Sequence, residues 1–352
     1  MNRILTYDST LRDGEQCEGI TLSLEDKLRI VERLDAFGVD FIEGGFPASN
    51  PKDIAFFQRV QEMPLKHARI AAFGSTCKKD VAAEDDRGLA DLVASGAPVV
   101  TIVGKTWDEQ VTRALLTTLD ENLRMIRDSV TYLKAQGLTV VFDAEHFFDG
   151  YKANADYAMA CVRAASEAGA TPSTYARRTA ARCLTRWRPS WPRSRASCPA
   201  SELGIHCHND SGCAVANSLA AVRAGATQVQ GTVNGFGERV GNTDLLTVVA
   251  DLELKMGCTC VGEERLRDLT SVAQFVAETC NLSVPNHHAL HGRVGVRAQG
   301  RPARERHRAF SGSLRAHESS KRWQRNANAR ERTCGQGVAC CEGKEPGNRP
   351  FG

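Results

Sequence analysis

The chain has 352 residues, an apolar content of 42% and a formal net charge of +3, so it is long enough to bury a substantial core. This composition excludes a fibrous or disordered protein, and no apolar run is long enough to cross a bilayer. The first residues lack the apolar region of a secretory signal, so we expect a cytoplasmic protein. Its 13 cysteines lack zinc-finger spacing and are predicted to be mostly reduced thiols.

The charge is unevenly distributed along the chain. Residues 171–200 contain seven arginines and no acidic residue, and residues 289–352 carry a net charge of +9. The remainder therefore carries −13, which describes an acidic globular protein with two basic segments. Basic segments raise the question of nucleic-acid binding, but neither contains a motif that reads nucleic acid, so we expect no such partner.

Short apolar runs alternate with helical patterns from the start of the chain. Residues 4–8 form the first predicted strand, Ser23 is the predicted N-cap of a helix over residues 24–37, and residues 39–43 form the next strand. The same unit then recurs. Further strands are predicted at residues 68–73, 98–103 and 138–142, in a short segment that ends at 206, and at 227–231. Further helices are predicted from residue 51 onward and at 89–95, 118–136, 154–168 and 214–224.

This alternation predicts parallel βαβ units. Seven strands are recognisable, and a gap between residues 170 and 201 lies where an eighth is expected. Eight such units favour an α/β fold of the (β/α)8 TIM-barrel type over an open doubly wound sheet, because no Gly-x-Gly-x-x-Gly motif follows the first strand. In such a barrel the functional site lies at the carboxyl ends of the strands.

The segment over residues 171–200 does not have the pattern of a sixth strand and helix. It shows no apolar alternation, and it contains Pro172, Pro189 and Pro192, which do not fit a buried parallel strand or a helix interior. We therefore expect a barrel that is disrupted in this region.

Polar residues follow several of the predicted strands. His206 and His208 are two apart on an extended segment, so both imidazoles point to the same side. Asp8 ends the first strand, and Asn242 ends a loop over residues 234–242 whose glycines allow the backbone a close approach. These oxygen and nitrogen ligands predict a metal site of Asp8, His206, His208 and Asn242, and Mg²⁺, Mn²⁺ and Zn²⁺ all suit it.

Each of these residues also has a purely structural interpretation. The two histidines can be unrelated polar residues on an edge strand, Asp8 can serve as a turn or cap residue, and Asn242 can be an ordinary loop residue. Their occurrence on separate loops of one predicted barrel favours the metal site.

Three motifs resemble a known family, the metal-dependent, acyl-CoA-condensing barrel enzymes that include isopropylmalate, homocitrate and citramalate synthases and hydroxymethylglutaryl-CoA lyase. These motifs are DSTLRDGEQ at residues 8–16, HCHND at 206–210 and GFGERVGN at 235–242. The runs at 42–53 and 142–152 are most similar to the citramalate synthase branch. The resemblance covers residues 1–170 and 201–288.

The resemblance implies a Claisen condensation, in which the enolate of acetyl-CoA attacks a metal-chelated 2-keto acid and thioester hydrolysis releases CoA. In this branch the keto acid is pyruvate, and the product, (R)-citramalate, feeds isoleucine synthesis. Arg12 is the implied oxyanion-stabilising residue, and Glu145 is the implied residue for proton transfer or for orienting the water. The implied substrate contacts come from Arg12, Asp13, Gln16, Glu43 and Asp143. An ion pair on the surface or in the core is the structural alternative for Arg12, Glu43 and Glu145.

The resemblance further implies small-molecule partners, no membrane and a homodimer. Two other functions stay open on the sequence alone. One is the same chemistry on another keto acid, as in isopropylmalate or homocitrate synthase. The other is an inactive remnant that acts only as a binding protein through its basic tail.

A shifted reading frame accounts for both basic segments. Codons compatible with residues 178–191, once shifted, can encode a loop and an amphipathic helix of the family's kind, and shifted codons from residue 292 onward can encode motifs of its accessory region. We therefore predict a barrel domain over residues 1–288, with 171–200 out of frame, and a basic out-of-frame tail over 289–352. Translated as written, the chain is then a truncated or impaired copy.

Overall fold

The computed structural model describes residues 2–47, 49–170, 173–177, 203–286 and 288–290. The chain divides into one compact unit of residues 1–285 with 289–291 and a second unit of residues 286–288 with 292–352. All the described strands and helices belong to the first unit. Most of the proposed out-of-frame segment and nearly all of the tail lie outside the described residues, so the shifted frame and the division at residue 288 stay predictions.

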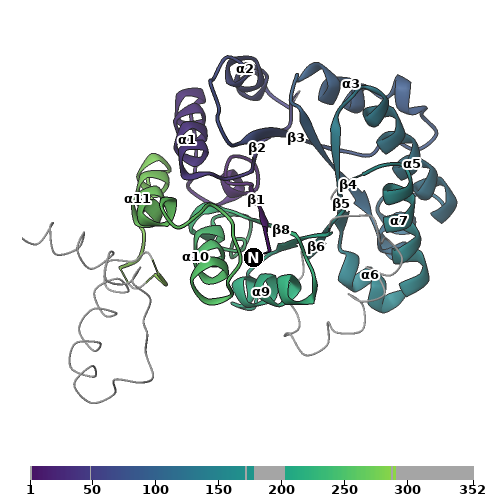
Figure 1. Cartoon of the computed structure of the whole chain (residues 1–352). Coiled ribbons are helices and arrows are strands. Elements are labelled where there is room, and N and C mark those ends of the chain that lie inside the picture. The colour runs from purple at the N-terminus through teal and green to yellow at the C-terminus, as the bar shows by residue number, and fades with distance from the viewer. Residues whose placement is uncertain (1, 48, 171–172, 178–202, 287, 291–352) are drawn as a thin grey trace, which may run out of the picture. The chain divides into compact units, whose positions relative to one another are not determined.

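Eight parallel strands close into a barrel in the first unit (Figure 1). They follow one another around the barrel in sequence order, and β8 pairs with β1 to close it. The strands are β1 (Leu5–Asp8), β2 (Phe41–Gly45), β3 (Arg69–Ser75), β4 (Val99–Lys105), β5 (Thr139–Glu145), β6 (Ser173–Arg177), β7 (Leu203–Cys207) and β8 (Gln228–Gly231). The predicted TIM barrel is therefore confirmed.

The sequence predicted that the sixth strand would be missing, and this prediction was wrong. Ser173–Arg177 forms β6, and its backbone pairs with β5 on one side and β7 on the other. The prolines that argued against a strand lie outside these five residues, and a parallel ladder needs only the main-chain groups that any non-proline residue supplies. The helix expected after β6 falls on residues outside the described part of the chain.

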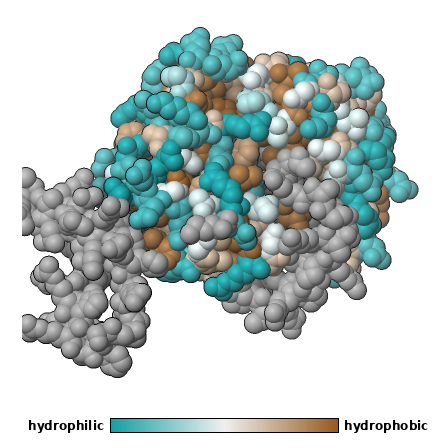
Figure 2. All heavy atoms as spheres, viewed as in Figure 1, coloured by the Kyte–Doolittle hydropathy of each residue, from teal (hydrophilic) through white to brown (hydrophobic). Residues whose placement is uncertain are grey.

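The helices surround the barrel (Figure 1). Figure 2 shows hydrophilic residues over much of the outer layer on this face, with hydrophobic atoms mostly between them. The helices are α1 (Leu24–Phe37), α2 (Pro51–Val60), α3 (Arg87–Ala94), α4 (Asp108–Arg113), α5 (Leu119–Ala135), α6 (Phe147–Ala153), α7 (Ala155–Glu167), α9 (Ala214–Ala224), α10 (Leu245–Lys255) and α11 (Leu269–Thr279). None of the helices in the described ranges is long and apolar enough to span a membrane.

Helix α1 has the ends that its sequence predicts. The Ser23 hydroxyl accepts a hydrogen bond from the backbone N–H of Asp26, and the Asp26 carboxylate accepts one from the backbone N–H of Ser23, which completes a capping box. Gly38 ends the helix with φ +92°, a left-handed conformation that glycine adopts without a steric cost.

The barrel interior contains a layer of buried side chains from β1 to β5, namely Tyr7, Phe41, Ala71, Val99 and Val141. Burying a large side chain of this kind contributes about 1.5–3 kcal/mol to folding. Tyr7 also connects this layer to the polar end of the barrel, because its hydroxyl donates to Glu43 Oε1 at 2.7 Å. Burial and the neighbouring Glu43 charge raise the pKa of Tyr7, so the phenol keeps its proton and remains a donor.

Asp35, near the end of α1, holds the segment that leads into β3. Its carboxylate accepts hydrogen bonds from the backbone N–H groups of Lys66, His67 and Ala68 at 2.7–3.0 Å. Burial alone would favour the neutral acid, but these N–H groups lower the pKa of Asp35 below its ordinary value.

We expect Asp35→Asn to lower the free energy of unfolding by about 1–3 kcal/mol at pH 7, because an amide is a weaker acceptor and brings donors that face N–H groups. The folded-state pKa lies below the unfolded-state value of about 4, so this stabilisation is present above pH ~4 and is lost as the pH falls through the folded-state pKa. Urea unfolding at pH 7 and pH 3 measures it. Glu32→Gln, an exposed change on the same helix, is the control. A deficit that stays constant down to pH 3 would contradict the assignment.

Candidate functional site

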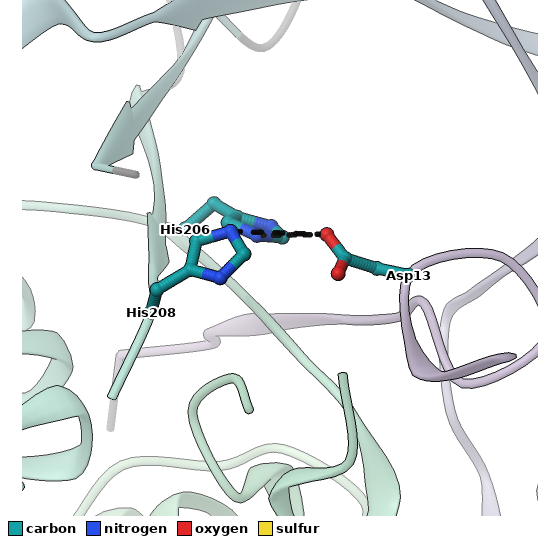
Figure 3. Close-up of side chains that lie close together, drawn as sticks. All are labelled: Asp13, His206 and His208. Carbon is teal, nitrogen blue, oxygen red and sulfur yellow. Dashed lines mark ion pairs between the residues drawn. The ribbon is translucent and has the colours of Figure 1, made fainter. Parts of the chain in front are cut away.

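One carboxylate and two imidazoles converge at the carboxyl-terminal rim of the barrel (Figure 3). Asp13, His206 and His208, here termed the rim cluster, are all buried, and one ligand atom of each lies within 4.8 Å of the others. The Nε2 atoms of His206 and His208 lie 3.5 and 3.9 Å from Asp13 Oδ2. Among the described residues, no other set of three or more His, Cys, Asp or Glu side chains has this geometry. The arrangement is typical of a divalent-cation site.

The strand order explains why these residues meet. His206 lies in β7 and His208 just beyond it, and their ring centroids are 5.2 Å apart, as the spacing on an extended chain predicts. Asp13 precedes the short 3-10 helix Gly14–Gln16 in the segment that follows β1. Because only β8 separates β7 from β1 around the barrel, the ends of these two strands lie on the same part of the rim.

Asp8 lies outside the rim cluster, although the sequence predicted it as the carboxylate ligand. Its Oδ1 accepts from the Thr10 backbone N–H and its Oδ2 from the Thr10 hydroxyl, both at 2.9 Å. Burial raises the pKa of Asp8 to about 7, although these hydrogen bonds oppose the shift. These contacts match the structural alternative given above for Asp8, which is that of a turn residue. The loop then returns over the rim and brings Asp13 to the histidines.

Asn242 lies against the rim cluster, as the sequence predicted. Its Nδ2 donates to Asp13 Oδ1 at 3.0 Å and to the backbone carbonyl of Phe236 at 3.2 Å. Its Oδ1 is buried and has no hydrogen-bond partner within the described residues. A buried carbonyl oxygen without a donor is costly, and a cation would satisfy it. The donor set therefore fits a divalent cation.

Two glycines allow the loop that carries Asn242 to approach so closely. Gly237 and Gly241 have φ values of +150° and +91°. A Cβ atom on Gly241 would lie 2.0 Å from the Gly235 carbonyl oxygen, and one on Gly237 would lie 2.1 Å from Asn242 Nδ2. Any side chain at either position would displace the loop, so the glycines in this motif serve the site directly.

Arg12 connects the rim cluster to β2. Its Nε donates to Glu43 Oε2 at 2.7 Å and its Nη1 to Asp13 Oδ2 at 3.1 Å. The guanidinium carbon lies 4.0 Å from the ring centroid of Phe73. Glu43 in turn accepts hydrogen bonds from Tyr7 and Ser9. The structure thus brings together Arg12, Asp13 and Glu43, which the resemblance had assigned to one site.

The charges of the cluster support one another. Burial opposes ionisation of Asp13, but the hydrogen bond from His206 and the charge of Arg12 hold its pKa well below the usual range. Burial likewise opposes a charge on His206, but Asp13 raises the pKa of that imidazole. Burial also disfavours the charged form of Arg12, yet Glu43 and Asp13 raise the pKa of its guanidinium. The carboxylate of Asp13 is therefore available as an anionic ligand.

The remaining predicted residues lie at other positions around the rim. Glu145 ends β5 and forms an ion pair with Lys105, its register partner at the end of β4. Asp143 is buried two residues earlier in β5, and its charge acts on His206. Gln16 ends the 3-10 helix after Asp13 and is exposed.

Sequence reasoning missed Lys105 and Gln230. Lys105 is a polar residue at a strand end, which is the criterion that selected Glu145. Gln228 and Gln230 are two residues apart on β8, so both point to the same face, and both are buried. Two polar residues at this spacing in a predicted barrel strand could have indicated that Gln230 belongs to the site. Gln230 Oε1 lies 3.1 Å from His206 Nδ1, so this residue contacts the rim cluster.

Comparison with known proteins identifies the family. The HMGL-like family model matches residues 3–276. The chain belongs to the HMGL-like family. It is 48% identical over 301 residues to an (R)-citramalate synthase of Synechocystis sp., with 84% of this chain and 55% of that protein covered. It is 50% identical over 293 residues to an (R)-citramalate synthase of Streptomyces coelicolor, with 83% and 54% covered.

These identities support the citramalate synthase branch within the HMGL-like family, since relatives named 2-isopropylmalate synthase are 33–34% identical. The HMG-CoA lyase of Bacillus subtilis has the same fold, with a TM-score of 0.69 at 19% identity, and the match covers 84% of this chain and 98% of that one. The chain spans about half the length of the curated citramalate synthases that it matches.

Proposed function

We propose that this HMGL-like chain condenses acetyl-CoA with pyruvate to give (R)-citramalate and CoA, at the rim cluster. The observation that carries the proposal is the convergence of Asp13, His206 and His208 beside the buried Arg12, in a chain whose similar relatives carry the name of this activity. We further propose that the protein is a homodimeric acyltransferase that acts on small molecules in the cytoplasm.

Asp13, His206 and His208 would hold the divalent cation, and Asn242 Oδ1 would add a neutral oxygen. When bound, such an ion polarises the carbonyl group of a 2-keto acid. Mg²⁺, Mn²⁺ and Zn²⁺ all accept this combination of oxygen and nitrogen ligands. The neighbours of Asp13 keep its carboxyl group ionised, so no proton has to leave Asp13 before the ion binds.

The chain's own residues supply the rest of the chemistry. Glu145 is proposed to take a proton from the acetyl methyl group, and Lys105 holds its carboxylate at the rim. The resulting enolate carbon would form the new bond to the keto carbon of pyruvate, while the π bond of the keto group breaks and its oxygen takes up the proton that Glu145 had accepted. Arg12 is proposed to stabilise the negative oxygen that develops in this step, because it is permanently charged and already fixed by Glu43. Water then cleaves the thioester and releases CoA and citramalate.

The test uses the full chain with Mg²⁺, Mn²⁺ or Zn²⁺, acetyl-CoA and one keto acid at a time. We expect citramalate and CoA in equal amounts with pyruvate, and less product with 2-ketoisovalerate or 2-ketoglutarate. Mass spectrometry of the products is the measurement, because 13 cysteines would react with a thiol reagent. Reactions without a keto acid control for simple thioester hydrolysis. CoA release that does not depend on a keto acid, or that is faster with a larger one, would refute the assignment.

A further inference from the structure

The two ring nitrogens of His206 have different partners. Its Nε2 faces Asp13 Oδ2 at 3.5 Å, in the direction of the rim cluster, while its Nδ1 lies 3.1 Å from Gln230 Oε1. His206 and Gln230 are both almost fully buried, with 3% and 2% of their surface exposed. Water therefore has little access to this contact, and the amide is the group that Nδ1 meets.

Strand pairing places the amide beside the ring. β7 and β8 are neighbours in the barrel, and their register makes His206 and Gln230 direct partners. Side chains at paired positions of adjacent strands point to the same side of the sheet. A slip of one residue would point Gln230 to the opposite side, so the contact is built into the closure of the barrel.

A second glutamine lies beside the amide nitrogen of Gln230. Gln230 Nε2 donates to Gln228 Oε1 at 3.3 Å. Gln228 lies two residues earlier on β8, on the same face, and is fully buried. Because the nitrogen of the Gln230 amide is engaged there, its oxygen faces His206. That oxygen can only accept, so Nδ1 must carry the hydrogen.

We propose that Gln230 is a positioning residue that keeps His206 protonated on Nδ1 and so directs the Nε2 lone pair toward the cation. This inference rests on the proposed metal site. A neutral imidazole ligates through whichever nitrogen lacks hydrogen, and the hydrogen bond made by the other nitrogen decides which one that is. Loss of such a partner typically weakens cation binding by about 10–100-fold. As an uncharged acceptor, Gln230 does this without adding a second negative charge beside Asp13.

The test titrates the metal-free full chain with Co²⁺ and follows its visible absorption, which reports both affinity and ligand geometry. We expect Gln230→Leu, which keeps the bulk but removes the acceptor, to bind Co²⁺ about 10–100-fold more weakly than the parent. Gln230→Glu restores an acceptor and is expected to bind within about threefold of the parent or more tightly. Gln228→Leu is the matched control, since it changes the same face of β8 but leaves the acceptor of His206 in place, and its loss should be smaller.

The possible results separate this inference from the metal site itself. Equal affinity of the parent and Gln230→Leu, or equal losses in Gln230→Leu and Gln230→Glu, would overturn the positioning role and leave the metal site standing. A parent chain that binds no Co²⁺ would overturn both.

A measurement on the parent chain keeps the inference testable if Gln230→Leu does not fold. Nitrogen-15 spectra of histidine-labelled protein loaded with Zn²⁺ are expected to show hydrogen on Nδ1 of His206 and the metal on Nε2. The opposite arrangement would overturn the proposal, because Gln230 would then act as a donor.

Discussion

Replacing Asp13 with Asn is expected to abolish cation binding by the rim cluster and to lower citramalate formation by about 10³-fold or more. Among the described residues, Asp13 is the carboxylate that groups with both imidazoles, so the variant removes the anionic ligand and leaves only neutral ones. An ion that polarises a carbonyl contributes several kcal/mol to the transition state, and each 1.4 kcal/mol is about tenfold in rate. Co²⁺ titration and product formation measure the two effects.

Asp8→Asn is the matched control for this experiment. Both residues are buried aspartates, Asp8 at the end of β1 and Asp13 in the segment that follows it, but Asp8 contacts Thr10 and not the histidines. An asparagine there keeps an oxygen for the Thr10 N–H, and the Thr10 hydroxyl can accept from the new amide. We expect Co²⁺ affinity within about threefold of the parent. If Asp8→Asn loses the cation and Asp13→Asn keeps it, the original sequence-based ligand set is correct.

Arg12→Met is expected to lower the free energy of unfolding by about 3–5 kcal/mol and to lower citramalate formation by at least about 10²-fold. The guanidinium is buried between Glu43 and Asp13, and removing it leaves two buried carboxylates without their shared counter-charge. Urea unfolding and product formation are the measurements. Arg12→Lys should recover only part of the loss, because an ammonium group cannot reproduce the fixed geometry of two guanidinium nitrogens.

A double-mutant cycle with Glu43→Gln separates the ion pair from general damage. In the Arg12→Met/Glu43→Gln chain one of the stranded charges is gone, so we expect the double variant to be clearly less destabilised than the sum of the two single variants. If the unfolding free energies are additive, the guanidinium does not stabilise the folded state through Glu43.

Local patterns in the sequence predicted most of the barrel. The stripe of apolar residues over 24–37, with Ser23 before it and Gly38 after it, matches α1 in both ends. The same patterns failed at β6, because Ser173–Arg177 owes its extended conformation to pairing with β5 and β7, and such pairing is not visible in the segment itself. A strand without apolar alternation can be predicted only from the closure of the whole barrel.

The candidate site was predicted in part, for a similar reason. The sequence placed His206, His208 and Asn242 near one another because His206 and His208 lie at the end of a strand and Asn242 lies in the loop after another, each in a short, recognisable motif. The choice between Asp8 and Asp13 depends on how the loop after β1 returns over the rim, and strand ends do not determine that path. The local signal was the threonine two residues after Asp8, whose N–H and hydroxyl both engage its carboxylate.

Asp13 and Asn242 touch in the finished protein although 229 positions separate them in the sequence. Because β8 closes the barrel between β7 and β1, no nascent chain that is still short of this strand can assemble the two halves of the site. Contacts this remote in sequence form late, after the entropy of closing the intervening chain has been overcome. A cation held by the rim cluster would therefore not nucleate folding in the way that zinc nucleates a zinc finger, and we expect it to bind a barrel that has already closed.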